Sequence, residues 1–183
     1  MRKTILIASV ILALASVAAA QIPTSGNVFF GYSYYNSDVS SINRTNMNGW
    51  EASVEGKILP FIGLVADVDA HYGSQFAYAC SGPLPCLQPP SSDFSERNYL
   101  FGPRVSVSLG KIRPFAEVLV GAGHVHVNYG NSDTSFVTAV GGGLDYKLLK
   151  VLAWRLQGDY IHTSLFSSHQ NNVRVSTGIV VRF

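Results

Sequence analysis

Charged residues are scarce in this chain of 183 residues, and so are cysteines. Asp, Glu, Lys and Arg together make up 13% of the sequence, which is about half of the quarter that is usual in soluble globular domains. Helical periodicity is almost absent after residue 20. The missing periodicity argues against a helical fold, and the low charge indicates that much of the folded surface faces something other than water.

The two cysteines, Cys80 and Cys86, flank a short segment that contains two prolines. Two cysteines without a nearby histidine provide too few ligands for a structural zinc site. In an exported protein the same spacing suits a disulfide that closes a small loop. We therefore expect a Cys80–Cys86 disulfide, with two free thiols as the alternative, and we expect no metal and no cofactor.

The N-terminus differs in composition from the rest of the chain. Arg2 and Lys3 precede an apolar run that ends at Val17, and three alanines follow. This order is typical of a secretory signal peptide, and the apolar run is short for a helical membrane span of about 20 residues. We predict a cleaved signal peptide at 1–20 and a single mature domain at 21–183, with a retained anchor helix as the alternative.

Cleavage would also change the net charge. The full chain has 13 basic and 11 acidic residues, and removal of Arg2 and Lys3 makes the two numbers equal. A neutral mature domain has no basic excess for phosphate backbones, so we expect no nucleic-acid partner.

Eight segments of alternating apolar and polar residues fill the rest of the chain. A period of two is typical of a strand with one apolar and one polar face, and about 9 to 11 residues let a tilted strand cross a bilayer. Short connections alternate with long polar ones, as in membrane-spanning barrels. We predict an all-β fold, an eight-stranded antiparallel up-and-down transmembrane β-barrel. The segments are 27–35, 49–58, 62–72, 98–109, 114–127, 136–148, 153–163 and 173–183; the short turns are 57–63, 109–114 and 147–152; the long loops are 36–47, 73–97, 128–133 and 164–172.

The polar faces of the segments carry the charges. A basic side chain at the bilayer midplane costs roughly 2–4 kcal/mol when it faces lipid, so the side of segment 49–58 that carries Glu51, Glu55 and Lys57 is expected to face inward. Charges removed from water need partners, and we predict a luminal ion-pair network in layers that each contain both signs. Its members are Glu51, Glu55, Lys57, Asp67, Asp69, Arg104, Glu117, Asp145, Lys147, Arg155, Asp159, Arg174 and Arg182.

Aromatic residues gather near both ends of the segments. Aromatic girdles flank the apolar band of membrane barrels at the two interfaces; ordinary packing in a soluble core is the alternative. The predicted girdle consists of Tyr32, Tyr34, Tyr72, Tyr99 and Tyr160 toward the long loops, Tyr146, Trp154 and Phe183 toward the short turns, and Trp50 as a further member.

The signal peptide, the eight amphipathic segments, the stretches GGGLDYKL and RLQGDY, and the aromatic C-terminus resemble eight-stranded outer-membrane barrels of the OmpA-like transmembrane-domain and OmpX type. The resemblance covers 21–183. It implies an outer-membrane location, contact with lipid, and reading of Val181 and Phe183 by the barrel-assembly machinery. Because this chain ends with the last segment, we do not expect the peptidoglycan-binding domain of OmpA, and we expect a monomer.

These features predict a non-enzymatic protein with a structural, surface-interaction or adhesive role, in which extracellular loops contact any outside partner. A soluble exported barrel of lipocalin type is one alternative, since alternation alone does not decide which face is outside. A lipid A deacylase is another, because His162, Thr163 and Ser164 resemble part of the catalytic set of PagL-type enzymes. That set also needs a later carboxylate, and no Asp or Glu follows Asp159.

Overall fold

The computed structural model describes residues 25–40, 43–75, 92–127, 132–163 and 170–183. The predicted signal peptide at 1–20 and the predicted disulfide partners Cys80 and Cys86 lie outside these residues. Within the described residues, no helix has both the length and the apolar character to cross a membrane.

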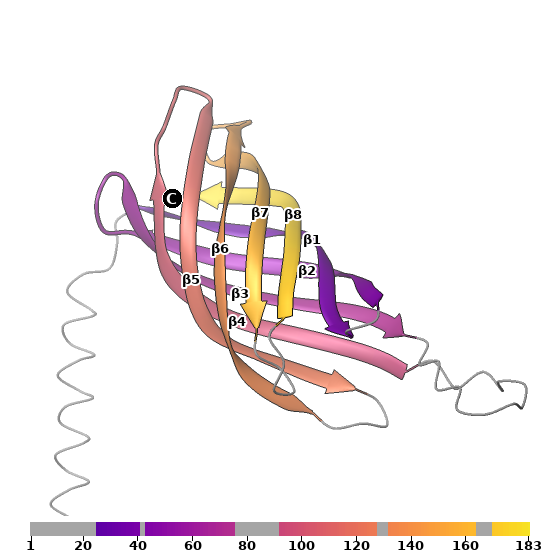
Figure 1. Cartoon of the computed structure of the whole chain (residues 1–183). Helices are drawn as coiled ribbons and strands as arrows, with labels where there is room; N and C mark the ends of the chain where they lie inside the picture. Colours follow the sequence, from indigo (N-terminus) through magenta and orange to yellow (C-terminus); the bar gives the residue numbers. More distant parts are fainter. Residues whose placement is uncertain (1–24, 41–42, 76–91, 128–131, 164–169) are drawn as a thin grey trace, which may run out of the picture.

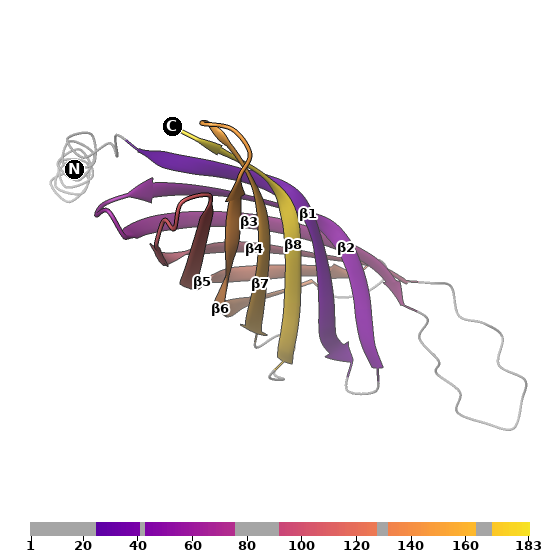
Figure 2. The same cartoon turned by 90° about the horizontal axis from the view of Figure 1, so that it is seen from above.

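Eight antiparallel strands form one closed barrel, in which each strand pairs with its neighbours along the chain. Figure 1 follows this order in colour from β1 to β8, and Figure 2 shows the same sheet from above. The predicted fold class is therefore confirmed. The strands are β1 Gly26–Ser40, β2 Asn43–Lys57, β3 Ile62–Gln75, β4 Ser92–Ser106, β5 Ile112–Val127, β6 Asp133–Lys147, β7 Leu152–Thr163 and β8 Gln170–Arg182.

The barrel closes between β1 and β8, which lie side by side in both views (Figures 1 and 2). The register runs from Asn27 opposite Arg182 to Asn36 opposite Val173. Beyond it, the amide of Gly26 donates to the carbonyl oxygen of Phe183 at 3.0 Å, and the amide of Phe183 donates back to Gly26 at 3.1 Å. Closure leaves β1 and β8 with no open sheet edge. A barrel in lipid must have no such edge, because the unpaired backbone groups would find no water to bond to.

The three predicted short turns lie together at one end of the barrel, called the turn end below. Between β4 and β5, Leu109 and Ile112 bond to each other through both amides, at 2.8 and 3.2 Å. Gly110 supplies the positive φ of 66° that such a two-residue hairpin turn requires. The turns between β2 and β3 and between β6 and β7 resemble each other, because Leu59 and Leu149 make equivalent amide bonds to the first residue of the following strand.

The opposite end, called the loop end, contains more strand than the sequence predicts. The expected loop 36–47 is largely strand, because β1 continues to Ser40 and β2 begins at Asn43. β3 continues to Gln75 and β4 begins at Ser92, inside the expected loop 73–97. Apolar and polar residues no longer alternate there, although backbone pairing continues. Alternation predicts the part of a strand that faces lipid, and it does not predict how far a strand extends into water.

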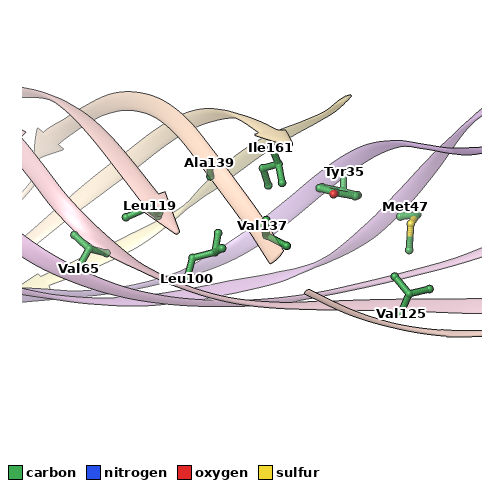
Figure 3. Packing of buried hydrophobic residues seen from close by; sticks show 9 residues of the cluster. All are labelled: Tyr35, Met47, Val65, Leu100, Leu119, Val125, Val137, Ala139 and Ile161. Atoms are coloured by element: carbon green, nitrogen blue, oxygen red, sulfur yellow. The ribbon is translucent and has the colours of Figure 1, made fainter. Parts of the chain in front are cut away.

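The two faces of the strands separate cleanly on β5, where Val118 is 50% exposed on the outside and its neighbour Leu119 is fully buried inside. The lumen thus contains apolar side chains as well as charged ones, which the alternation did not predict. The buried apolar cluster consists of Tyr35, Met47, Val65, Leu100, Leu119, Val125, Val137, Ala139 and Ile161 (Figure 3). An interior of this size is just wide enough for side chains to fill.

Candidate functional site

Polar side chains from different strands meet in the lumen of the barrel, where they are withdrawn from solvent. Near the turn end, Arg104 on β4 lies between two carboxylates. Its guanidinium Nη2 is 2.6 Å from Glu117 Oε2, and its Nη1 is 3.3 Å from Glu55 Oε2. The second oxygen of Glu55 is 3.0 Å from Arg113 Nη2, which also donates to Ser106 Oγ at 2.6 Å. Arg104 meets Glu117 because the β4–β5 register places them directly opposite each other.

A second group at this end is built around Asp145 on β6. Its Oδ1 is 2.7 Å from Arg155 Nε, and its Oδ2 is 3.2 Å from Arg182 Nη2. The guanidinium carbon of Arg155 lies 4.6 Å from the ring centroid of Phe115 and 5.1 Å from that of Phe29. Arg155 is therefore held by one carboxylate and by two aromatic faces, which attract a cation through their quadrupoles. The turn-side network comprises Glu55, Arg104, Arg113, Glu117, Asp145, Arg155 and Arg182.

Toward the loop end, Arg174 on β8 contacts four acidic side chains. Its Nη1 is 2.8 Å from Asp67 Oδ1 and 2.5 Å from Asp69 Oδ2. Its Nη2 is 2.9 Å from Asp159 Oδ2, and its Nε is 3.4 Å from Glu51 Oε2. These five residues are all buried, and they form the loop-side network. A single guanidinium group thus serves carboxyl groups from β2, β3 and β7.

Gln157 on β7 connects the two networks. Its amide Nε2 lies 3.0 Å from Glu117 Oε1 on the turn side, and 3.1 and 2.9 Å from Glu51 Oε1 and Asp159 Oδ2 on the loop side. Ser176 Oγ donates a further hydrogen bond to Glu51 Oε2 at 2.5 Å. Neutral donors therefore supplement the arginines where carboxyl groups are in excess.

On the loop-end side of Arg174, a chain of buried polar groups leads from Asp69 through His71 to Ser33. His71 Nε2 is 2.8 Å from Ser33 Oγ, and His71 Nδ1 is 3.1 Å from Asp69 Oδ1. This order of serine, histidine and aspartate is the connectivity of a hydrolase triad. All three side chains are fully buried, so a substrate carbonyl cannot reach Ser33. The arrangement acts as an internal support for Asp69, which Asn98 also contacts at 2.9 Å.

Arginines outnumber acidic residues in the turn-side network, and acidic residues outnumber arginines in the loop-side network. The turn-side network has Arg104, Arg113, Arg155 and Arg182 against Glu55, Glu117 and Asp145. The loop-side network has one arginine against four acidic residues. Both signs are present at both ends, as the sequence predicts, but the balance shifts from basic at the turn end to acidic at the loop end.

Two predicted members of the network lie elsewhere. Lys147, the last residue of β6, is exposed at the turn end and does not join the luminal pairs. Lys57 is half-buried, and its Nζ donates to the carbonyl oxygen of Pro60 at 3.0 Å and contacts Ser106 Oγ at 3.4 Å. Both residues end a strand, where a flexible side chain can reach bulk water instead of the lumen.

Other luminal groups were missed by the sequence analysis. Arg113 falls in the predicted turn 109–114, and Glu96 falls in the predicted loop 73–97. In the structure both side chains are buried in the lumen, and Glu96 Oε1 accepts a hydrogen bond from Tyr35 Oη at 2.8 Å. Parity would have found them, since Arg113 is in phase with Glu117, and Glu96 is in phase with Asn98 and Arg104.

The GGG stretch on β6 makes room for luminal side chains. A Cβ atom at Gly141 would collide with Asp159 Oδ1, and one at Gly143 would meet the backbone of Leu156 and the ring of Phe115. These glycines allow Asp159 and Phe115 to fold over β6, as expected for small residues on a strand that a neighbour approaches closely.

The predicted girdle residues lie on the outer surface. Tyr146, Trp154 and Phe183 are exposed toward the turn end. The proposed assembly signal, Val181 and Phe183, shares this outer face. Toward the loop end, Tyr34 is half-exposed and donates to Asn46 Oδ1 at 2.8 Å. The exposed members there are Tyr32, Trp50, Tyr72, Tyr99 and Tyr160.

His162, on which the deacylase alternative rests, and His124 lie on the outer face of the barrel at the loop end. His124 Nδ1 is 2.8 Å from Thr134 Oγ1, and His162 Nδ1 is 2.9 Å from Asn171 Oδ1. Among the residues that the structure describes, no group of three or more His, Cys, Asp or Glu side chains is arranged to hold a metal ion. Ser164, which the deacylase alternative requires beside His162, lies outside the described residues.

The model for one protein family, the outer membrane protein beta-barrel domain, matches residues 5–183. Comparison with curated protein sequences gave no match.

Solved outer-membrane barrels share the fold. Ail, the attachment invasion locus protein of Yersinia pestis, has a TM-score of 0.59 at 15% identity, covering 87% of this chain and 98% of that one. Neisserial surface protein A has a TM-score of 0.67 at 13% identity, covering 86% and 97%. The N-terminal β-barrel domain of Pseudomonas aeruginosa OprF has a TM-score of 0.52 at 8% identity, covering 86% and 99%. The TM-scores show a common fold, and at identities this low the likeness extends to the fold alone.

Proposed function

The chain belongs to the outer membrane protein beta-barrel domain family, and from this premise we propose that it is a non-enzymatic surface protein whose loop end makes contacts outside the cell. It lies in the outer membrane, and its short turns face the periplasm. A soluble lipocalin-type barrel would need an apolar lumen and a polar exterior. The ion pairs of this barrel are inside, and its outer surface is a belt of exposed apolar side chains, so that alternative does not hold.

A passive interior supports the proposal. The fully buried side chains of Arg104, Arg155 and Arg174 are each bonded to carboxyl groups of other strands, and buried apolar residues share the lumen with them. The Ser33–His71–Asp69 chain has no access to substrate. A filled lumen favours neither a channel nor an internal active site, so we expect planar-bilayer recordings to show no stable conductance steps.

The observation that carries the proposal is a change of chemistry on the outer wall. On the turn-end side of Tyr32, the outside of β1 and β2 is apolar, as at Phe30 and Val54. From Tyr32 toward the loop end, hydrogen-bonding side chains replace the apolar ones. Tyr32 Oη donates to Asn48 Oδ1, and Asn36 Nδ2 donates to Asn46 Oδ1 at 2.7 Å. Asn36, Asn46 and Asn48 therefore give the outside of β1 and β2 a polar patch beyond the apolar belt, of the kind that contacts polar partners such as glycans.

A binding experiment tests the proposal. The protein in lipid nanodiscs is passed over immobilised glycans and over sucrose octasulfate, the heparin analogue present in a solved complex of Ail. We expect binding that falls when Asn46 and Asn48 are both replaced by Ala, or when residues 81–85 are deleted. The matched control is Ser108→Ala, an exposed polar change at the turn end that should leave binding intact.

Two outcomes would overturn the proposal. One is binding that neither loop-end variant weakens. The other is release of acyl chains from lipid A by the wild-type protein, detected by mass spectrometry, which would favour the deacylase alternative with His162. Heat-modifiable migration in detergent gels checks that each variant is folded.

A further inference from the structure

The turn end is unusually apolar for the side of a barrel that borders water. The turn collar consists of residues 57–62, 107–112 and 147–152 together with Phe183. Leu109 is 65% exposed, Phe183 is 64% exposed, and Ile58 and Leu149 are each 60% exposed. Each Å² of this apolar surface would cost about 25 cal/mol if it were left in water.

The collar continues the lipid-facing surface of the strands. Ile112 and Val181 are exposed on the outer wall, and the girdle residues Tyr146 and Trp154 lie at the same end. The apolar side chains of the turns therefore extend the apolar belt beyond the last strand residues. This continuity indicates that the turns dip into the membrane interface.

Lysines are the charged residues of the collar. Every lysine of the described chain is here, at Lys57, Lys111, Lys147 and Lys150, and the three turn segments contain no Asp or Glu. The nearby carboxylates Glu55 and Asp145 are buried and already bonded to luminal arginines. The outward charge of these segments is thus positive.

An apolar ring interleaved with lysines is matched to a lipid interface. The four-carbon stem of lysine can lie along apolar surface while the ammonium group extends to the headgroup level. Basic residues at an anionic membrane surface each contribute about 1 kcal/mol of attraction, which is about fivefold in an equilibrium constant.

We propose that the turn collar binds anionic phospholipids through the headgroup phosphates of the leaflet that the turns face. The apolar turn residues hold the acyl-chain boundary, and the ammonium groups of Lys111, Lys147 and Lys150 contact the phosphates. Lys57, which is tied to Pro60 and Ser106, contributes less. This inference concerns the end opposite to the surface of the proposed function and stands without it.

Spin-labelled lipids test the collar directly. The protein is reconstituted in phosphatidylcholine vesicles that contain a trace of spin-labelled phosphatidylglycerol or phosphatidylcholine, and electron paramagnetic resonance gives the fraction of each lipid immobilised at the barrel. The wild type should prefer phosphatidylglycerol by about fivefold. The preference should fall to near unity in the variant K57Q/K111Q/K147Q/K150Q and in high salt.

Two controls make the result specific. The variant with four Lys→Arg changes keeps the charge and should keep the preference, whereas Arg97→Gln, on the outer wall at the loop end, should not alter it. The proposal is overturned if the wild type shows no preference, if the four Gln changes leave it unchanged, or if Arg97→Gln removes it equally. Heat-modifiable migration confirms that the variants are folded before they are compared.

Discussion

The two ends of the lumen solve the same electrostatic problem in different ways. In the turn-side network the acidic side chains are shared, so that Glu55 has Arg104 and Arg113, and Asp145 has Arg155 and Arg182. In the loop-side network Arg174 alone joins four acidic side chains. Removing one partner of a buried pair leaves an uncompensated charge, which is far costlier than replacing the whole pair. The turn-side network is therefore redundant, whereas the loop-side network depends on one residue.

The largest effect is therefore expected at Arg174. Arg174→Ala should lower the free energy of unfolding by about 3–5 kcal/mol, because it leaves buried carboxyl groups without their common cation. Urea titration of the protein in lipid vesicles, followed by tryptophan fluorescence, measures the change. Arg174→Lys keeps a charge and should lose less; an Ala variant as stable as wild type would show that Arg174 does not hold the loop-side network.

Arg104→Ala should cost less than Arg174→Ala, at the lower end of the range of about 3–5 kcal/mol for a broken buried pair. Arg113 still holds Glu55 in this variant, so only Glu117 loses its cation. The same titration compares the two variants. A larger loss at Arg104 than at Arg174 would reverse the proposed order of the two networks.

The outer wall provides a contrast with both networks. Val118→Arg places a charge on the lipid-facing side of β5, and we expect a loss of about 2–4 kcal/mol. Ser95→Arg makes the same change on the outside of β4 at the loop end, beside Arg97, and should cost about 0–1 kcal/mol because that level borders water. Equal losses at the two sites would mean that the apolar belt has been placed at the wrong height.

The smallest effect is expected at Lys57, which the sequence assigns to the network and the structure places at its margin. Lys57→Met should change the free energy of unfolding by less than about 1 kcal/mol, as for partly exposed charges. A loss as large as that of Arg104→Ala in the same titration would return Lys57 to the network.

The sequence predicted the barrel, its strand order and its charged lumen because the bilayer enforces alternation along every strand. It placed Arg104, Arg155 and Arg174 inside on parity alone. It did not predict that Leu119 and Val65 are luminal, because an apolar residue is compatible with either face. The predicted first strand also ends too early, at Tyr35, and the predicted fourth strand begins too late, at Asn98. The reason is that strand segments beyond the lipid lose the alternation of apolar and polar residues.

Pairing across the lumen could not be predicted either. Arg174 meets Asp67 and Glu51 only after the barrel closes, since β8 is distant in the chain from β2 and β3 and neighbours neither of them in the sheet. Parity states which side chains point inward, whereas closure, strand tilt and side-chain length decide which of them touch.

The barrel has lipid outside and a filled, ion-paired lumen inside. Val118 and Leu119 test it most directly, because both are apolar neighbours and only the register separates them. In a background with Cys80 and Cys86 replaced by Ser, Val118→Cys and Leu119→Cys variants in vesicles are photolysed with a lipid-soluble carbene precursor, whose insertion needs no ionised thiol, and the modified residue is identified by mass spectrometry. We expect rapid labelling of the Val118→Cys variant and protection of the Leu119→Cys variant. Labelling of Leu119→Cys in preference to Val118→Cys would contradict it.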